Sequence, residues 1–383
     1  KKAAKHKLKN PKTSPELVNF NCENGWLREI YNAAITNRLN SNFGHHQKVI
    51  STAAVVLDTM PETKEWIDWV MKSGGMTSNY LQVTGGNVNA QLMNIVDRDG
   101  HGNESAPAYN AGWVTSILLV ADVLKGYDKY AAANLYDHPK VQRMAFSMLE
   151  LTCATKYTPN IGDSGYFGKS FLPASVSDLI LLWAGGIHDE NIAKQIYYLS
   201  GNRLDNVHTD IFTREPEKIQ REIQDIITRS GADITLDSNN LTGYGLGILR
   251  DGLNIKSSPT QSKNTQRDIW MYYGYNGGHG HFDKLNIGIH AYGLDFTPDL
   301  GNPLQKTIEP NNQQWVRQPL AHNTVLVNQG LKTPSDIRYD RTQNITKMAT
   351  PIHFDDSGSV KVMDVDSPET YDATKNGAFR RTI

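Results

Sequence analysis

The chain has 383 residues, of which 39% are hydrophobic, and 39 basic residues almost balance 40 acidic ones. This composition is typical of a folded protein and excludes a disordered chain, while the net charge of −1 gives no overall attraction to nucleic acid. No run of roughly 18 apolar residues is present, so we expect no membrane span. The basic N-terminal segment KKAAKHKLKNPKTSP has no apolar stretch behind it and is not an intact signal peptide, which leaves both a mature exported protein and a cytoplasmic one open.

Apolar residues recur at helical spacing up to about residue 230. Proline in the first turn and glycine after the last turn support a helix in PETKEWIDWVMKSGG, which starts at Pro61. Short joins between the helices favour antiparallel hairpins in a bundle, a solenoid or a toroid, and no fixed-period repeat is present. We predict helices at 26–39, 45–60, 61–75, 80–96, 108–125, 138–156, 174–185, 189–200 and 215–229.

After about residue 235 the chain consists of short segments in which apolar and polar residues alternate. Gly, Asn and Asp separate these segments, which is the pattern of antiparallel strands. We therefore predict a helical domain over 1–235 and an antiparallel β-sandwich over 236–383, with an end, FRRTI, that carries no closing turn signal and allows a truncated sandwich. The predicted strands are ADITLDS, GYGLGILRDG, DIWMYYGYN, KLNIGIHAYG, LDFTPD, HNTVLVNQG and SVKVMDVDS.

Histidine and aspartate gather in the β part. His279, His281 and Asp283 lie in GHGHFD, Asp299 lies in PDLG, and His322 lies in AHNTV. In an extended backbone His279 and His281 would face the same side. One such residue alone would be a hydrogen-bonded turn residue, but three His and two Asp within 44 residues suit zinc. The spacing matches no short zinc motif.

Two polar segments of the helical part are further candidates. DRDGHGNESAPAYNAGW (97–113) is a glycine-bearing loop that runs into a helix and carries Glu104 and Tyr109. NSNFGHHQKV (40–49) places Asn42, His45 and His46 at a helix start, where the free N–H groups favour an anion such as a carboxylate. The plainer interpretation is that Asn42 caps the helix and that Tyr109 is a half-buried packing residue.

Two other features are interpreted as structural. GDSG (162–165) lacks the full G-x-S-x-G pattern of a serine hydrolase, so Ser164 is expected to be a turn residue. Cys22 and Cys153 lie far apart on predicted helices and form neither a metal motif nor a disulfide framework, so we expect two buried free thiols. No dinucleotide-binding or P-loop motif is present.

The succession of GHGHFD, PDLG and AHNTV after a helical part resembles the heparinase II/III family of polysaccharide lyases, over about residues 25–335. NESAPAYN resembles the catalytic tyrosine segment of that family. The resemblance implies an incomplete (α/α) toroid that leads into an antiparallel β-sandwich, with a catalytic groove between the two. It also implies a structural Zn²⁺, one per chain, held by His281, Asp299 and His322.

The resemblance implies β-elimination next to a uronic acid, which gives an unsaturated uronate product. Tyr109 would protonate the leaving O4 oxygen, and would also be the base in a syn reaction, whereas His279 would be the base for the opposite C5 configuration. GHHQ resembles the family's Asn-His pair, but His45 stands at the asparagine position. The group that neutralises the substrate carboxylate therefore stays open among Asn42, His45 and His46, with Glu104 assisting.

The partner implied by the resemblance is an acidic polysaccharide, with a glycosaminoglycan such as heparin or heparan sulfate first and alginate or ulvan as alternatives. Such an enzyme is expected in the periplasm or outside the cell. A rival enzyme, a glycoside hydrolase, would need two opposed carboxylates from among Asp97, Asp99, Glu104 and Asp163. A non-catalytic carbohydrate-binding protein would use tryptophan platforms, with Trp26, Trp113, Trp270 and Trp315 as candidates. The sequence leaves endo or exo action and oligomeric state open.

Overall fold

The computed structural model describes residues 14–36, 38–39, 44–74, 87–154, 157–165, 175–205, 207, 213–251, 266–302, 315–327, 343–344, 346–371 and 379–383. The backbone forms two compact units. The first unit comprises Lys1–Ile95 and Thr115–Val141, and the second comprises Val96–Val114 and Gln142–Ile383. Among the described residues, no helix has the length and apolar character of a membrane span.

The first unit is helical. Its core is built where α3 and α4 pack together, with Ile50, Ala54, Trp66 and Ile67 all buried. Tyr31 of α2 stacks on Trp66 with 4.8 Å between ring centroids, which joins a third helix to this core. The helices are α1 (Pro15–Cys22), α2 (Arg28–Ile35), α3 (His45–Leu57), α4 (Glu62–Asp68), α5 (Val88–Asn94) and the second part of α6 (Pro107–Leu124), with π-helical turns at Glu23–Leu27 and Trp69–Ser73 and 3₁₀ turns at Asp128–Ala133 and Leu135–Asp137.

The helices of the second unit begin and end where their capping residues predict. Ser175 accepts a hydrogen bond from the Asp178 amide at the start of α8 (Val176–Gly185), and Gly186 in the left-handed conformation ends it. Asp189 caps α9 (Glu190–Leu199) in the same way. The other helices of this unit are most of α7 (Pro139–Glu150), α10 (Pro216–Ser230) and the first two turns of α6.

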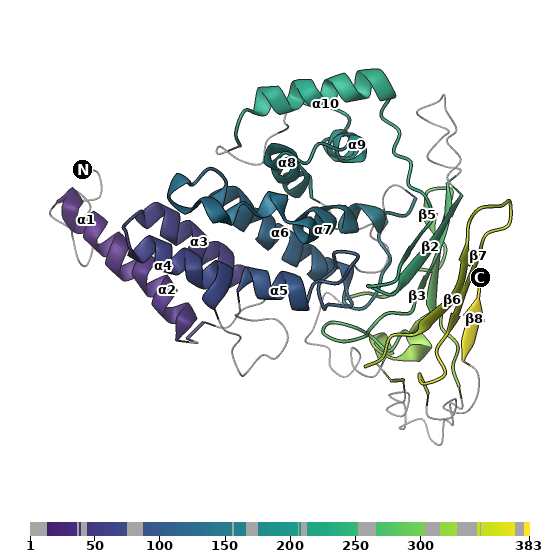
Figure 1. Ribbon diagram of the computed structural model, residues 1–383. Helices are drawn as coiled ribbons and strands as arrows, with labels where there is room; N and C mark the ends of the chain where they lie inside the picture. Colours follow the sequence, from purple (N-terminus) through teal and green to yellow (C-terminus); the bar gives the residue numbers. More distant parts are fainter. Residues whose placement is uncertain are drawn as a thin grey trace. The chain divides into compact units, whose positions relative to one another are not determined.

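Two antiparallel sheets follow the helices in the second unit (Figure 1). The first sheet has the order β1-β2-β3-β4-β5, so each strand pairs with the next one in the sequence. The second has the order β6-β7-β8. The strands are β1 (Asn239–Leu241), β2 (Leu246–Asp251), β3 (Arg267–Tyr272), β4 (Asn286–Ala291), β5 (Leu294–Asp295), β6 (Thr350–Asp355), β7 (Val362–Asp366) and β8 (Arg380–Thr382).

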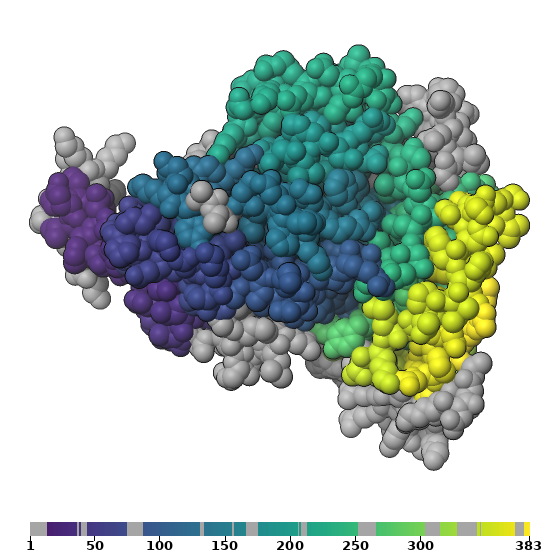
Figure 2. Space-filling view, in the orientation of Figure 1, coloured from purple at the N-terminus to yellow at the C-terminus, as the bar shows by residue number. Residues whose placement is uncertain are grey.

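One apolar core joins the two sheets. Met271 and Tyr273 from the β3 region pack with Met363 and Val365 of β7, and each of these four side chains is fully buried. In the space-filling view the yellow C-terminal residues lie against the green residues of the first sheet (Figure 2). Burial of apolar surface contributes roughly 25 cal/mol per Å², so this shared core holds the sheets face to face as a β-sandwich.

The structure agrees with the sequence predictions in the order of helices and strands and differs from them at particular segments. All described α-helices end by Ser230 and all described strands begin at Asn239 or later, as predicted, although a short 3₁₀ helix, η8 (Pro319–Ala321), lies in the β part. The compact units divide the chain elsewhere, so a domain boundary at 235 stays a prediction. Within the described residues, the predicted strands at 232–238 and 322–327 are not strands. Three observed strands, β1, β6 and β8, were not predicted. β6 contains Pro351, which an edge strand tolerates.

The cysteine prediction was half wrong. Cys22 ends α1 but is only partly buried. Cys153 is buried, yet it follows the end of α7 and forms an isolated β-bridge with Tyr157 rather than lying on a helix. Both thiols are free, as expected.

Candidate active site

The structure brings Tyr109 and His279 into direct contact. Tyr109 lies in the first turn of α6, which starts at Pro107, and His279 lies in the loop between β3 and β4. Their rings stack with 3.4 Å between centroids and 7° between planes. The His279 side chain is 33% exposed, so solvent and a ligand can reach this pair.

Both histidines of GHGHFD lie in the β3–β4 loop, but their side chains have different surroundings. Residues 274–285 are not a strand, since β3 ends at Tyr272 and β4 starts at Asn286. Gly278 adopts a φ of +55°, and a side chain there would overlap the Glu104 carboxylate. The backbone here is therefore not extended, so the same-side arrangement of an extended chain does not apply: this turn leaves His279 partly exposed and buries His281 completely.

Glu104 orients the ring of His279. Its Oε2 atom accepts hydrogen bonds from the His279 Nδ1 atom at 2.9 Å and from the His279 amide at 3.2 Å. A carboxylate on Nδ1 keeps the hydrogen on that nitrogen and leaves Nε2 as the atom that can take a proton. Glu104 is only 3% exposed, so it acts on His279 rather than on a ligand.

The surroundings of Tyr109 favour its neutral form. Burial raises the pKa of the phenol, and the nearby charges of Asp163 and Glu104 raise it further. At neutral pH the hydroxyl group therefore carries its proton and can donate it.

The predicted metal ligands also meet. One ligand atom each of His281, Asp299 and His322 lies within 4.8 Å of the others, and all three residues are buried. His322 Nδ1 contacts Asp299 Oδ2 at 2.6 Å, and His281 Nε2 contacts Asp163 Oδ1 at 3.0 Å. The remaining ring nitrogens, His281 Nδ1 and His322 Nε2, are buried without a hydrogen-bond partner among the described residues. Two orphan imidazole nitrogens beside a carboxylate fit a zinc ion.

Two neighbouring carboxylates belong to this buried group. Burial raises the pKa of Asp283, although the charges of His322 and His281 oppose that shift. Burial also raises the pKa of Asp163, but the His281 hydrogen bond and the charges of His281, His279 and Arg317 outweigh it, so the net pKa is lowered. Sequence reasoning gave Asp163 no role at the metal group; GDSG was the only signal, and it was interpreted as a turn.

The predicted carboxylate-neutralising residues belong to the first unit, apart from Asn42, which lies outside the described residues. His45 is the first residue of α3, after Gly44 with a φ of +89°, and His46 is 6% exposed. Burial lowers the pKa of both histidines, with smaller contributions from the Lys48 charge on His45 and the His45 charge on His46. Both are therefore neutral at pH 7 and can act as hydrogen-bond donors rather than cations.

The four carboxylates that a glycoside hydrolase would recruit accept hydrogen bonds from other groups, whereas the candidate sugar-binding tryptophans differ in exposure. Asp97 accepts hydrogen bonds from the amides of Asp99 and His101, and Asp99 accepts one from the Tyr244 amide at 3.1 Å. With Glu104 on His279 and Asp163 on His281, all four candidate hydrolase carboxylates have partners. Of the candidate tryptophans, two are 2% exposed, Trp113 and Trp270, and two are largely exposed, Trp26 (68%) and Trp315 (46%).

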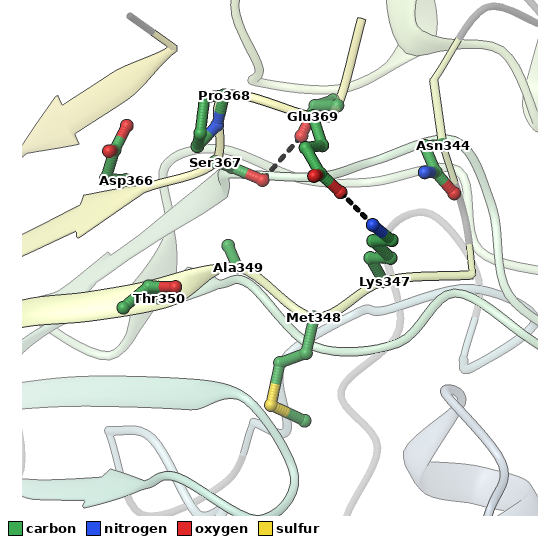
Figure 3. Close-up of a pocket in the computed structure, with 10 residues that line it drawn as sticks. Asn344, Lys347, Met348, Ala349, Thr350, Asp366, Ser367, Pro368 and Glu369 are labelled. Atoms are coloured by element: carbon green, nitrogen blue, oxygen red, sulfur yellow. Dashed lines mark hydrogen bonds and ion pairs between the residues drawn. The ribbon is translucent and has the colours of Figure 1, made fainter. Parts of the chain in front are cut away.

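A separate pocket of about 280 Å³ lies beside β6 and β7 and is lined by residues 344, 347–350 and 366–370. Lys347 and Glu369 form an ion pair at its edge (Figure 3). None of the predicted site residues lines it, and it contains no histidine or cysteine. It is therefore not the candidate active site.

Comparison with known proteins supports the resemblance. Residues 271–383 match the family described as heparinase II/III-like, C-terminal. Over this range the chain is similar to the heparinase II/III-like family. The matched range contains His279 and all three predicted zinc ligands.

Proteins named as lyases or heparinases also match this chain among curated proteins and solved structures. The exo-oligoalginate lyase of Saccharophagus degradans is 32% identical over 92 residues, which are 22% of this chain and 11% of that protein. A mutant of the heparan sulfate lyase HepC from Pedobacter heparinus aligns with a TM-score of 0.60 at 16% identity, over 96% of this chain and 46% of that one. The heparinase III BT4657 gene product aligns with a TM-score of 0.58 at 14% identity, over 96% and 48%.

At these identities the solved structures show a shared fold. The chain spans about half the length of these solved structures and about a tenth of the alginate lyase.

Proposed function

We propose that this chain contains the catalytic centre of a polysaccharide lyase that cleaves a uronic-acid-containing polysaccharide by β-elimination. The observation that carries the proposal is the stacked Tyr109–His279 pair, in which a neutral phenol lies against an imidazole oriented by Glu104. The heparinase II/III-like match and the lyases named among the relatives support the same reaction class.

Elimination requires three groups around one sugar ring. The C5 proton is a poor acid while the uronate is charged, so a donor must first meet the carboxylate, and one well-placed donor typically contributes about 10²–10³ in rate. A base must take the C5 proton and an acid must protonate O4, which together contribute roughly 10²–10⁴. Acid and base must both be within hydrogen-bond reach of the same sugar.

The described residues provide the acid and the base. His279 uses Nε2 to accept the C5 proton, because Glu104 holds its Nδ1 atom. Tyr109, whose pKa is raised, donates its proton to O4. In a syn reaction the same phenol would also remove the C5 proton, which its raised pKa disfavours unless a cation is near. One of Asn42, His45 and His46 is proposed as the carboxylate-neutralising donor.

We further propose that His281, Asp299 and His322 hold one Zn²⁺. Their buried orphan nitrogens and clustered ligand atoms support this assignment. When bound, the ion would cross-link the β3–β4 loop to the segments that carry Asp299 and His322, and so fix the position of His279. Elimination itself requires no Lewis acid, so the residues of the pair carry the chemistry.

The finer features of the proposal rest on the family resemblance. Heparin or heparan sulfate is the first candidate substrate, because relatives are named heparan sulfate lyases, and alginate is the second, because another is named an exo-oligoalginate lyase. Ulvan is the third. An incomplete (α/α) toroid for the helices and a periplasmic or secreted location complete the proposal.

A panel of uronate polysaccharides tests the function directly. Heparan sulfate, other glycosaminoglycans, alginate and ulvan are incubated with the protein, and unsaturated product is followed by ultraviolet absorbance. Absorbance growth with one of them is expected. New reducing ends without absorbance would indicate a hydrolase, and binding without turnover would indicate a non-catalytic carbohydrate-binding protein; either result contradicts the proposal.

A further inference from the structure

The loop Gly162–Gly165 contacts several segments of the candidate site in the second unit. The Asp163 amide donates to the His279 carbonyl at 2.9 Å, and the Asp163 carboxylate contacts His281 Nε2 at 3.0 Å. Ser164 Oγ accepts a hydrogen bond from the Ala108 amide at 3.0 Å, next to Tyr109. Gly165 accepts one from the amide of Asn302, three residues after Asp299.

The residue types of this loop fit its close approach to the β3–β4 loop. Gly162 has a φ of +58°, and a side chain there would overlap the carbonyl oxygen of His279. Ser164 is fully buried, and the Asp163 side chain is 14% exposed. A buried carboxylate needs a specific partner, and the partner of Asp163 is a predicted metal ligand.

The contact with Asp163 determines which nitrogen of His281 is available. A carboxylate beside Nε2 keeps a hydrogen on that atom, so Nδ1 keeps its lone pair. Nδ1 is the buried nitrogen of His281 that has no hydrogen-bond partner among the described residues. Histidines that bind metals commonly donate their other N–H to a carboxylate, which fixes the ring orientation and makes the ligand more basic.

We infer that Asp163 is a positioning residue that orients His281 for zinc, and that its loop links the metal group to the Tyr109–His279 pair. This inference rests on the proposed zinc site but not on the lyase reaction. It also gives the GDSG segment a role other than the hydrolase nucleophile or the simple turn considered from the sequence.

Zinc affinity tests the inference without any activity measurement. Apo protein is titrated with zinc in competition with a chromophoric chelator, for the unchanged chain and for Asp163→Ala and Asp163→Asn. We expect Asp163→Ala to weaken zinc binding about 10–100-fold, the effect typical of losing such a partner. Asp163→Asn should weaken it less, because an amide oxygen still accepts the N–H but carries no charge.

A matched control separates positioning from general destabilisation. Asp189→Ala removes another half-buried aspartate of the same unit, the N-cap of α9. It should lower Tm equally with and without zinc and leave zinc affinity unchanged. Asp163→Ala should lower Tm more in the zinc-loaded protein than in the zinc-free protein.

The inference is overturned if Asp163→Ala binds zinc within about threefold of the unchanged chain, or if the unchanged chain binds no zinc. Should Asp163→Ala fail to fold, Asp163→Asn decides, and affinity within about twofold overturns the inference. A chain that shows the expected loss of zinc affinity but degrades no polysaccharide contradicts only the proposed lyase function.

Discussion

The second unit contains two polar groups that share one loop but differ in exposure. The Tyr109–His279 pair is half-exposed and has titratable atoms that a ligand can reach, whereas His281, Asp299 and His322 are buried. A single residue, Gly280, separates His279 from His281. The roles proposed for the two groups, reaction for the pair and metal binding for the buried residues, therefore follow exposure more than residue type.

The largest expected effect comes from the exposed pair. Tyr109→Phe removes the proposed proton donor to O4 while keeping the ring stack with His279, so formation of unsaturated product should fall by roughly 10²–10⁴. Ultraviolet absorbance measures the rate. Tyr292→Phe, at a tyrosine that is 58% exposed, is the control and should be neutral. Activity of Tyr109→Phe within a few-fold of the unchanged chain would remove Tyr109 from the mechanism.

A substitution in the buried group of His281, Asp299 and His322 should first change the zinc content of the protein. Metal analysis should find about one zinc per chain, and His322→Ala should lose it because one of three protein ligands is gone. Tm should fall in this variant, and a chelator should lower Tm of the unchanged chain but not of the variant. Full zinc occupancy in His322→Ala would exclude His322 as a ligand.

Weakening the hydrogen bond between Glu104 and His279 should lower kcat by a smaller factor than the loss of the Tyr109 hydroxyl group. Glu104→Gln keeps a hydrogen-bonding group at the same place but removes the charge that holds the Nδ1 hydrogen, so kcat should fall about 10–100-fold with KM little changed. Steady-state kinetics on the best substrate of the panel measures both. A rise in KM with unchanged kcat would instead point to direct binding of substrate by Glu104.

The pH profile shows how the pair divides acid and base. Burial and the charges of Asp163 and Glu104 raise the pKa of Tyr109 above its ordinary value near 10. As an acid, Tyr109 must be protonated, so its ionisation should not reduce kcat below about pH 10. If kcat instead rises continuously from pH 8 to 10 and this rise is absent in Tyr109→Phe, the phenol acts as the base.

The smallest effect concerns the loop that reaches α6. Ser164→Ala removes the acceptor of the Ala108 amide, which should lower the free energy of unfolding by about 1 kcal/mol and slow the reaction a few-fold by loosening Tyr109. Ser175→Ala removes a similar cap from α8 and is the matched control. Equal loss of stability in both variants, with slower product formation only in Ser164→Ala, is expected. Unchanged product formation in Ser164→Ala would show that this hydrogen bond does not position Tyr109.

Much of the fold could be predicted because its signals are local. Apolar spacing, Pro61 and the short alternating segments identify most helices and strands, and the His and Asp motifs point to the three residues whose possible ligand atoms lie within 4.8 Å of one another. The contact between Asp163 and His281 spans 118 residues and has no local pattern, so it could not be predicted. The different environments of His279 and His281 were implied by the family resemblance and not by periodicity, which does not encode the left-handed backbone of Gly278.

Complete burial of the three proposed ligands has a consequence for biosynthesis. An ion reaches His281, Asp299 and His322 only when the chain around them opens, so loading is expected to be faster during folding than in the folded protein. The compartment in which the chain folds, and the metals available there, would then decide which ion the mature protein carries.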